Sequence, residues 1–221
     1  RARWILFFSM LIVVINHWPA FNSFFTSDSL GLIRHCDTLS QQGTLWQWML
    51  SNFSQGLTVE SNYYRPLSAA SICLDYQLFG VQAQGWHIHQ LALHLINGLL
   101  LYQLGALLAA NNRHGRSMAA IASLLFWLSP ATPEVSLWIA GRYNVLATLF
   151  GLVAIICHVK NKPVLSAIGM ALALCSKESA MILPALLFSV SWWRHHIEQG
   201  PAPYFSERIR NLIRELTPSA I

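Results

Sequence analysis

Long apolar stretches alternate with short polar ones along most of this chain. The apolar stretches are Trp4–Phe21, Trp86–Ala110, Ser117–Leu128, Tyr143–Val159, Pro163–Cys175 and Ala180–Trp193. A helix needs about 20 apolar residues to cross a hydrocarbon core of about 30 Å. The pattern therefore predicts six helices. The shorter ones would span only with apolar flanking residues or inside a bundle.

Composition indicates that a membrane surrounds these helices. The 221 residues are 54% hydrophobic and 10% charged, and the mean hydropathy is +0.43. Soluble domains are typically about 25% charged. We therefore expect an all-α, polytopic transmembrane bundle. For the first stretch a cleaved signal peptide is the alternative, because Arg1 and Arg3 precede it, but no small-residue cleavage site follows promptly.

The basic residues between the stretches indicate the orientation of the bundle. Asn111–Arg116, His158–Lys162 and Trp193–His196 are basic and contain no acidic residue. Cytoplasmic loops of membrane proteins are enriched in Lys and Arg. With the N-terminus inside, these segments become inner loops and every acidic residue before Trp193 falls on the outer side. The net charge of +5 then reflects topology and indicates no nucleic-acid partner.

The longest polar stretch, residues 22–85, would form the first outer loop. Within it, "DSLGLIRHCDTL" and "LWQWMLSNF" have the apolar spacing of short interfacial helices, and Leu67–Phe79 predicts a further amphipathic helix. Cys36 and Cys73 both lie in this loop and could pair in an oxidising compartment, with free thiols as the alternative. We expect residues 1–193 to form the membrane domain and residues 194–221 a cytoplasmic amphipathic tail or the start of a further region.

Ionisable residues gather at the outer ends of the predicted spans. They are Asp28 after the first span, His87 and His89 at the second, Glu134 and Arg142 between the third and fourth, and Lys177 and Glu178 between the fifth and sixth. Ionisable residues at membrane depth are costly and are candidates for function. Solvated helix ends, or ion pairs that hold the bundle together, are the alternative. A three-ligand metal site is not evident among the His residues.

An acid beside several cations at an outer membrane surface suits the transfer of a sugar from a lipid phosphate. Arg or Lys would stabilise the negative charge on the departing phosphate, and a carboxylate would take the proton of the acceptor. Neither step requires a nucleotide or a metal. A transporter or flippase is the alternative from another class. It would place ionisable residues near the bilayer midplane, where these spans carry almost none.

Three blocks carry a resemblance to a known family. They are "NYYRPLSAASICLDYQLFG…GWHIHQLALHLINGLLLYQL", "SPATPEVSLWIAGRYNVLATLF" and "CSKESAMILPALLF", and they cover most of Asn62–Phe188. Together they resemble the membrane-embedded GT-C glycosyltransferases, nearest to the bacterial and tetratricopeptide-containing branch related to protein O-mannosyltransferases. The resemblance implies a polyprenyl-phosphate sugar donor, a lipid, glycan or protein acceptor, and an active periplasmic face of a bacterial inner membrane. In a eukaryotic relative the same face would lie in the lumen of the endoplasmic reticulum.

The resemblance also implies roles for individual residues. The catalytic carboxylate of the family's first outer loop matches Asp28, although relatives often carry a second acid where this chain has Ser29. The residues expected to hold the donor phosphate are Arg65, Arg142 and Lys177, with Glu134, Glu178, His87 and His89 in supporting positions. A divalent metal, used by some relatives, is the one cofactor considered. A truncated or non-catalytic family member is the alternative to an active enzyme.

Overall fold

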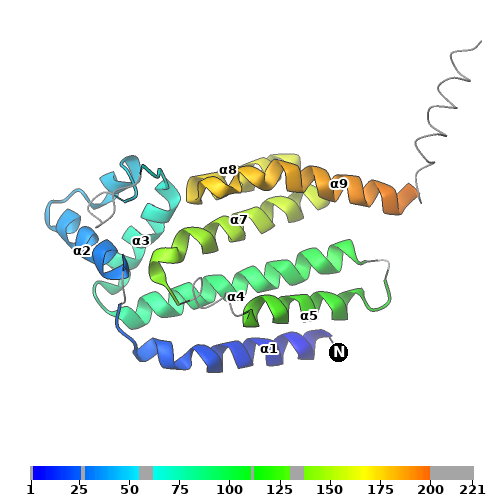
Figure 1. The fold of residues 1–221 in the computed structure, drawn as a ribbon, viewed down its shortest axis with the longest axis horizontal. Helices are drawn as coiled ribbons and strands as arrows, with labels where there is room; N and C mark the ends of the chain where they lie inside the picture. Colours follow the sequence, from blue (N-terminus) through cyan, green and yellow to red (C-terminus); the bar gives the residue numbers. More distant parts are fainter. Residues whose placement is uncertain (1, 26–27, 55–61, 111, 130–136, 200–221) are drawn as a thin grey trace, which may run out of the picture. The chain divides into compact units, whose positions relative to one another are not determined.

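The computed structural model describes residues 2–25, 28–54, 62–110, 112–129 and 137–199, and every regular element among these residues is helical (Figure 1). The chain divides into two compact units, residues 1–184 and 185–221. The first unit holds all the helices discussed below except most of α9 (Leu183–Gln199), which crosses the division. The all-α fold expected from the sequence is confirmed for the described residues.

Each of the six predicted apolar stretches forms a helix. They are α1 (Ala2–His17), extended by the 3-10 helix η1 (Trp18–Asn22), then α4 (Ala83–Leu108), α5 (Gly115–Leu128), α7 (Arg142–Val159), α8 (Pro163–Ser176) and α9. Three segments are long and apolar enough to cross a membrane: Ala2–Asn22, Ala83–Leu108 and Ile139–Val159. α5 and α8 are apolar but shorter. The chain is therefore an integral membrane protein, and the count of six spans stays a prediction.

Five of these helices lie side by side in the first unit. α1 packs on α5, α5 on α4, α4 on α7, and α7 on α8 (Figure 1). Small residues allow the close approaches, as is usual between membrane helices. A Cβ atom added at Gly98 of α4 would lie 2.0 Å from the indole of Trp127 in α5, and one at Gly169 of α8 would lie 3.0 Å from the backbone of Ala154 in α7. Larger residues at these positions would force the helices apart.

The segment predicted to form the first outer loop folds against one end of this bundle. It contains α2 (Asp28–Gln41), the 3-10 helix η2 (Leu45–Leu50) and α3 (Pro66–Phe79), so the predicted short helices are confirmed. The prediction that α3 is amphipathic was wrong, because Leu74 and Leu78 are exposed while Ser68 and Asp75 are buried. A shared apolar core joins α2, η2 and α3 to the start of α4 and to η3 (Ile139–Gly141). Cys36 and Cys73 lie in this core as buried free thiols.

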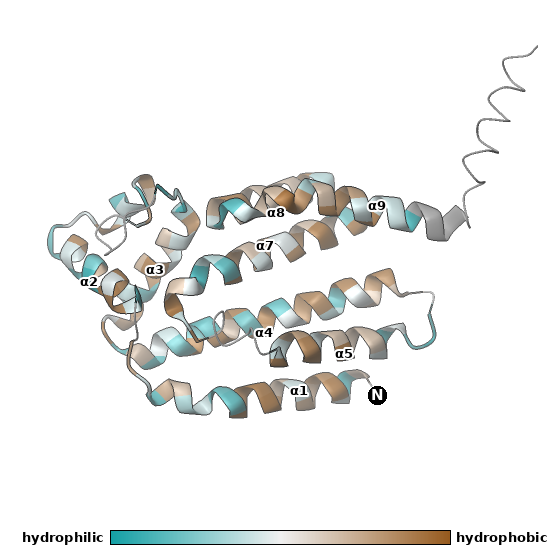
Figure 2. Ribbon diagram, in the orientation of Figure 1, coloured by the Kyte–Doolittle hydropathy of each residue, from teal (hydrophilic) through white to brown (hydrophobic). Residues whose placement is uncertain are grey.

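The alternating direction of the helices brings many predicted site residues to the same end of the first unit. α1 ends there, α4 and α7 begin there, and α8 ends there (Figure 1). Hydrophilic residues mark the first turns of α4 and α7, whereas α1 and α5 are mostly hydrophobic (Figure 2). The basic segments that join α4 to α5 and α7 to α8 lie at the opposite end. This arrangement agrees with the orientation inferred from the basic residues.

The predicted division at residue 193 is not tested by the structure. The compact units divide after Pro184, and the expected amphipathic helix of the tail lies outside the described residues.

Candidate functional site

Arg142, the first residue of α7, is the centre of a fully buried polar cluster. Its guanidinium is 0% exposed and donates from Nη2 to Oδ2 of Asp75 at 2.6 Å. Its other donors reach Oε1 of Gln90 at 2.5 Å and Oγ of Ser71 at 2.9 Å. Asp75 is also 0% exposed. The cluster therefore joins α3, α4 and α7 through one guanidinium whose contacts are all internal.

His89 of α4 forms the edge of this cluster. Its Nδ1 is hydrogen-bonded to Oδ1 of Asp75 and lies 3.3 Å from Nη1 of Arg142. A carboxylate only accepts hydrogen bonds and a guanidinium only donates them. The hydrogen bond to Asp75 therefore requires a proton on Nδ1, and the contact with Nη1 of Arg142 is then not a hydrogen bond. The His89 side chain is 30% exposed, so the ring also reaches the surface of the cluster.

A second charged cluster lies at the start of α3 and the end of α8. Arg65 binds Glu178 with two hydrogen bonds, from Nε at 2.9 Å and from Nη2 at 2.6 Å. The guanidinium also stacks over Tyr63 and Tyr143, 4.3 Å and 4.2 Å from their ring centroids. The hydrogen bonds from Arg65 lower the pKa of Glu178. Glu178 is 49% exposed while Arg65 is 7% exposed, so the pair opens to the surface on its carboxylate side.

Lys177 lies beside this second pair. Its Nζ donates to Oδ1 of Asn144 at 2.6 Å and sits 5.1 Å above the ring centroid of Tyr143. Ser68 of α3 donates to the carbonyl of Ser176 at 3.0 Å, which fixes the end of α8 against α3. Two cations, Arg65 and Lys177, thus share one aromatic ring. This pair of cations is therefore a candidate for binding an anion.

Asp28 begins α2 and is exposed. Its neighbour Ser29 is buried and accepts a hydrogen bond from the backbone N–H of Ala140 at 3.3 Å. Ala140 belongs to η3, the turn directly before Arg142. The start of α2 is therefore anchored to the start of α7, on the same end of the unit as the charged clusters.

The remaining predicted residues are placed as follows. His87 is buried, and its Nε2 lies 3.3 Å from Oγ of Ser23, so it joins the first outer loop to α4. Glu134 lies outside the described residues. Within the described ranges no three His, Cys, Asp or Glu side chains are grouped as they would be around a metal ion. The divalent metal considered above stays untested.

Sequence reasoning missed the partners of the predicted cations. Asp75, Gln90 and Ser71 hold Arg142, and Tyr143 and Asn144 lie against Lys177. One signal was available: Asp75 interrupts the apolar run "SICLDYQLF". Ser71 and Asp75 are also four residues apart on α3, so they share one face of the helix.

The structure restricts one predicted role in particular. Arg142 was expected to hold the donor phosphate, but its guanidinium is enclosed and bonded to three side chains. A phosphate could reach it only if one of those bonds broke. Arg65 and Lys177 lie in a more accessible cluster. They therefore remain the better candidates for direct contact with an anion.

A cavity of about 330 Å³ adjoins the Arg142 cluster. Its wall is formed by η2, α3, α4 and α7 and is almost entirely apolar, with Ser71 and His89 as the polar exceptions. The lining residues are Trp46, Leu67, Ala70, Ser71, Leu74, His89, Leu93, Leu146 and Phe150. Ligand pockets of this kind, apolar with a few polar groups, typically start at about 300 Å³.

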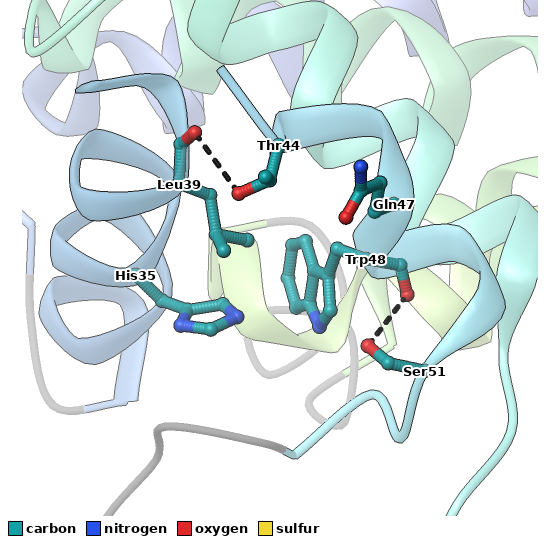
Figure 3. A pocket seen from close by; sticks show the side chains of 6 residues that line it. All are labelled: His35, Leu39, Thr44, Gln47, Trp48 and Ser51. Carbon is teal, nitrogen blue, oxygen red and sulfur yellow. Dashed lines mark hydrogen bonds between the residues drawn. The ribbon is translucent and has the colours of Figure 1, made fainter. Parts of the chain in front are cut away.

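A second cavity, of about 270 Å³, lies between α2 and η2 (Figure 3). His35, Leu39 and Trp48 face one another there, and Thr44, Gln47 and Ser51 complete the wall. Burial lowers the pKa of His35. Nε2 of His35 and Nε1 of Trp48 are buried without a hydrogen-bond partner among the described residues. None of the residues predicted as functional lines this second cavity.

Comparison with known proteins gives two curated relatives. A protein O-mannosyl-transferase of Caenorhabditis elegans, F38B6.6, is 34% identical over 101 residues, which are 46% of this chain and 14% of the relative. The protein O-mannosyl-transferase TMTC3 of Homo sapiens is 28% identical over 99 residues, 45% of this chain and 10% of the relative. The chain therefore matches less than a sixth of either relative's length. No protein-family model matches the chain, and no solved structure matches it.

These similarities favour a glycosyltransferase-type function for the part of the chain that they cover. Both relatives are animal proteins, so the bacterial branch and the bacterial inner membrane gain no support from them.

Proposed function

We propose that this chain contributes to the active site of a membrane glycosyltransferase that moves a sugar from a polyprenyl phosphate to a protein acceptor. The observation that carries the proposal is the exposed side of the Arg65–Glu178 and Lys177 cluster, at the end of the unit where α2 begins with Asp28. Both curated relatives are named as protein O-mannosyl-transferases, which favours a protein over a lipid or a glycan as acceptor.

The cations suit the leaving group of this reaction. When the bond between the anomeric carbon and the phosphate oxygen breaks, the phosphate gains negative charge. Preorganised positive groups in a site with little water stabilise such charge strongly. Lys177 is held by Asn144 and Tyr143, and Arg65 is held by two rings and Glu178, so neither cation has to be ordered when the donor arrives.

Asp28 suits the role of the base. It is an exposed carboxylate on the first turn of α2. As base it would take the proton of the acceptor while the acceptor's heteroatom attacks the anomeric carbon.

The test is transfer of radiolabelled sugar from a panel of polyprenyl-phosphate sugars to endogenous membrane proteins. The chain would be compared with its Asp28→Asn and Asp37→Asn variants. Asp37 is a matched control because it lies nine residues further along the same helix, about 14 Å away along its axis. We expect Asp28→Asn to abolish transfer and Asp37→Asn to retain it. Equal transfer by all three proteins would exclude Asp28 as the base.

A second comparison tests the cations. Lys177→Gln keeps a polar side chain but removes the charge, and we expect transfer to fall by about 10²-fold, as when a single charge-stabilising donor is removed from other enzymes. Lys162→Gln, at the opposite end of α8, is the matched control. Equal losses in both variants would show that Lys177 acts only on folding. Absence of transfer from every donor by the folded wild-type chain would contradict the proposed function itself.

A further inference from the structure

We propose that the cavity between α2 and η2 is a second ligand site, which binds one neutral pyranose ring other than the sugar that is transferred. The Nε1–H group of Trp48 donates a hydrogen bond to that ring (Figure 3). The inference goes beyond the proposed function, because Asp28, Arg65 and Lys177 do not line this cavity.

Trp48 brings a buried donor to the cavity that no described residue satisfies. Trp48 is 2% exposed, and its Nε1 has no hydrogen-bond partner in the described part of the chain. An indole N–H can only donate, and leaving a buried donor unpaired is costly. A ligand in the cavity must therefore present an acceptor oxygen to Trp48.

Two hydroxyl groups in the wall need the opposite kind of partner. Oγ1 of Thr44 donates to the carbonyl of Leu39 at 3.4 Å, and Oγ of Ser51 donates to the carbonyl of Trp48 at 3.1 Å (Figure 3). Each hydroxyl has a single proton, so both oxygens can only accept from a ligand. The cavity therefore suits a ligand that accepts and donates hydrogen bonds, as the hydroxyls of a sugar do.

The same wall disfavours an anion. The described residues that line the cavity include no Lys or Arg, so an anion would find no countercharge there. An ionised phosphate or carboxylate also lacks the protons that Thr44 and Ser51 can accept. A hydroxyl, by contrast, can bond to the buried Nε2 of His35 in either tautomer of the ring, because it both donates and accepts.

The size and the apolar part of the wall favour a single ring. A pyranose carries hydroxyls around its edge and C–H groups on its faces. Leu39 and the indole of Trp48 provide apolar surface for those faces. The volume of about 270 Å³ lies just below the roughly 300–1,000 Å³ of pockets for drug-sized ligands, so the cavity suits one sugar ring better than a chain of them.

Aromatic contacts place this cavity apart from the proposed phosphate site. Trp48 stacks on Phe53 with ring centroids 5.4 Å apart, and the guanidinium of Arg65 lies 5.7 Å from the Phe53 centroid. Neither Phe53 nor Arg65 lines the cavity. A donor sugar is bonded directly to its phosphate, so a phosphate at Arg65 keeps that sugar near Arg65. Only this separation rests on the proposed function; the binding of a pyranose does not.

The experiment measures sugar binding without any transfer. The whole chain in lipid nanodiscs is titrated with methyl α-mannopyranoside, and the dissociation constant is obtained by saturation-transfer difference NMR. Mannose is the probe because both curated relatives are named mannosyl-transferases. We expect saturable binding that neither inorganic phosphate nor a polyprenyl-phosphate mannose displaces. The indole N–H signal of Trp48, identified by its absence in Trp48→Phe, should shift as the sugar binds.

Variants assign the binding to this cavity. Trp48→Phe keeps an aromatic ring and removes the N–H group, and we expect it to weaken binding about 10-fold. Thr44→Val keeps the shape of the side chain without its oxygen and should weaken binding about 5-fold. The matched control is Thr38→Val on α2, whose hydroxyl bonds to the carbonyl of Arg34 outside the cavity and which should bind like the wild type.

Three outcomes would overturn the inference. They are no binding to the wild type, which would leave only water in the cavity, displacement of the sugar by phosphate or by the donor, and unchanged binding in Thr44→Val. The last comparison stands even if Trp48→Phe fails to fold. Sugar binding by a chain that transfers no sugar would contradict the proposed function and leave this site. Sugar transfer by a chain that does not bind the mannoside would contradict this site alone.

Discussion

Two Arg–carboxylate pairs lie at the same end of this bundle and differ in their surroundings. Arg142–Asp75 and Arg65–Glu178 each contain a hydrogen bond of 2.6 Å. Both side chains of the first pair are 0% exposed, whereas Glu178 in the second is 49% exposed. The first guanidinium is bound by three polar side chains, and the second lies between aromatic rings.

This difference in burial separates the roles of the two pairs. Separating Arg142 from Asp75 would leave an uncompensated charge in the buried cluster, which is strongly destabilising. The pair therefore acts as a fixed support for α3, α4 and α7. Glu178 can rotate into water at little cost, since a half-exposed ion pair contributes little free energy. The proposed function requires Arg65 to bind the donor phosphate in that place. The Arg142–Asp75 pair is thus a structural support, whereas the Arg65–Glu178 pair contains the group proposed to bind the phosphate.

The largest expected effect comes from breaking the buried pair. Arg142→Met leaves Asp75 buried without its cation, and we expect a loss of about 3–5 kcal/mol in the free energy of unfolding. The measurement is denaturant titration of the purified chain in mild detergent. Arg113→Met, in the exposed segment between α4 and α5, is the control and should change stability by less than about 0.5 kcal/mol. A loss below about 1 kcal/mol in Arg142→Met would show that water reaches the cluster.

Replacing both members of the buried pair should recover much of that loss. In Arg142→Met with Asp75→Leu no charge is stranded, and buried ion pairs replaced by apolar residues are often neutral in stability. We expect the double variant to recover at least about half of the loss in the same titration. A double variant less stable than Arg142→Met would mean that the losses simply add.

Breaking the half-exposed Arg65–Glu178 pair should lower the free energy of unfolding much less. Glu178→Gln removes the charge but keeps the size of the side chain, and we expect a change of at most about 1 kcal/mol in the free energy of unfolding. A loss comparable to that of Arg142→Met would contradict the comparison between the two pairs.

The smallest expected effect is the pH dependence of the stability that Glu178 contributes through its pair with Arg65. Hydrogen bonds from Arg65 lower the pKa of Glu178 in the folded chain. Its contribution to stability is therefore complete above the unfolded pKa of Glu, about 4.3, and is lost as the pH falls through the lower folded pKa. The stability difference between wild type and Glu178→Gln should be constant near neutral pH and shrink below about pH 4. If this stability difference grew as the pH fell, the pKa of Glu178 would have to be raised in the folded chain, not lowered.

Much of the helical architecture could be predicted because it depends on local pattern. The apolar stretches and the basic segments between them gave all six helices and an orientation that agrees with the bundle. Pro66 opens α3 and Pro163 opens α8, where a helix tolerates a residue without an N–H group. The candidate site was predicted less completely. The sequence singled out Arg65, Arg142 and Lys177, but it could not tell which of them is enclosed.

The sequence by itself determined that this chain forms apolar helices and that ionisable residues gather at one end of them, because hydrophobic length and the placement of charges act locally and through the solvent. Only the tertiary structure decided the pairing of Asp75 with Arg142 and of Glu178 with Arg65. These partners are 67 and 113 residues apart in the chain. They meet only when α3, α7 and the end of α8 pack together. That packing encloses both members of the Arg142–Asp75 pair and leaves the carboxylate of the Arg65–Glu178 pair half exposed.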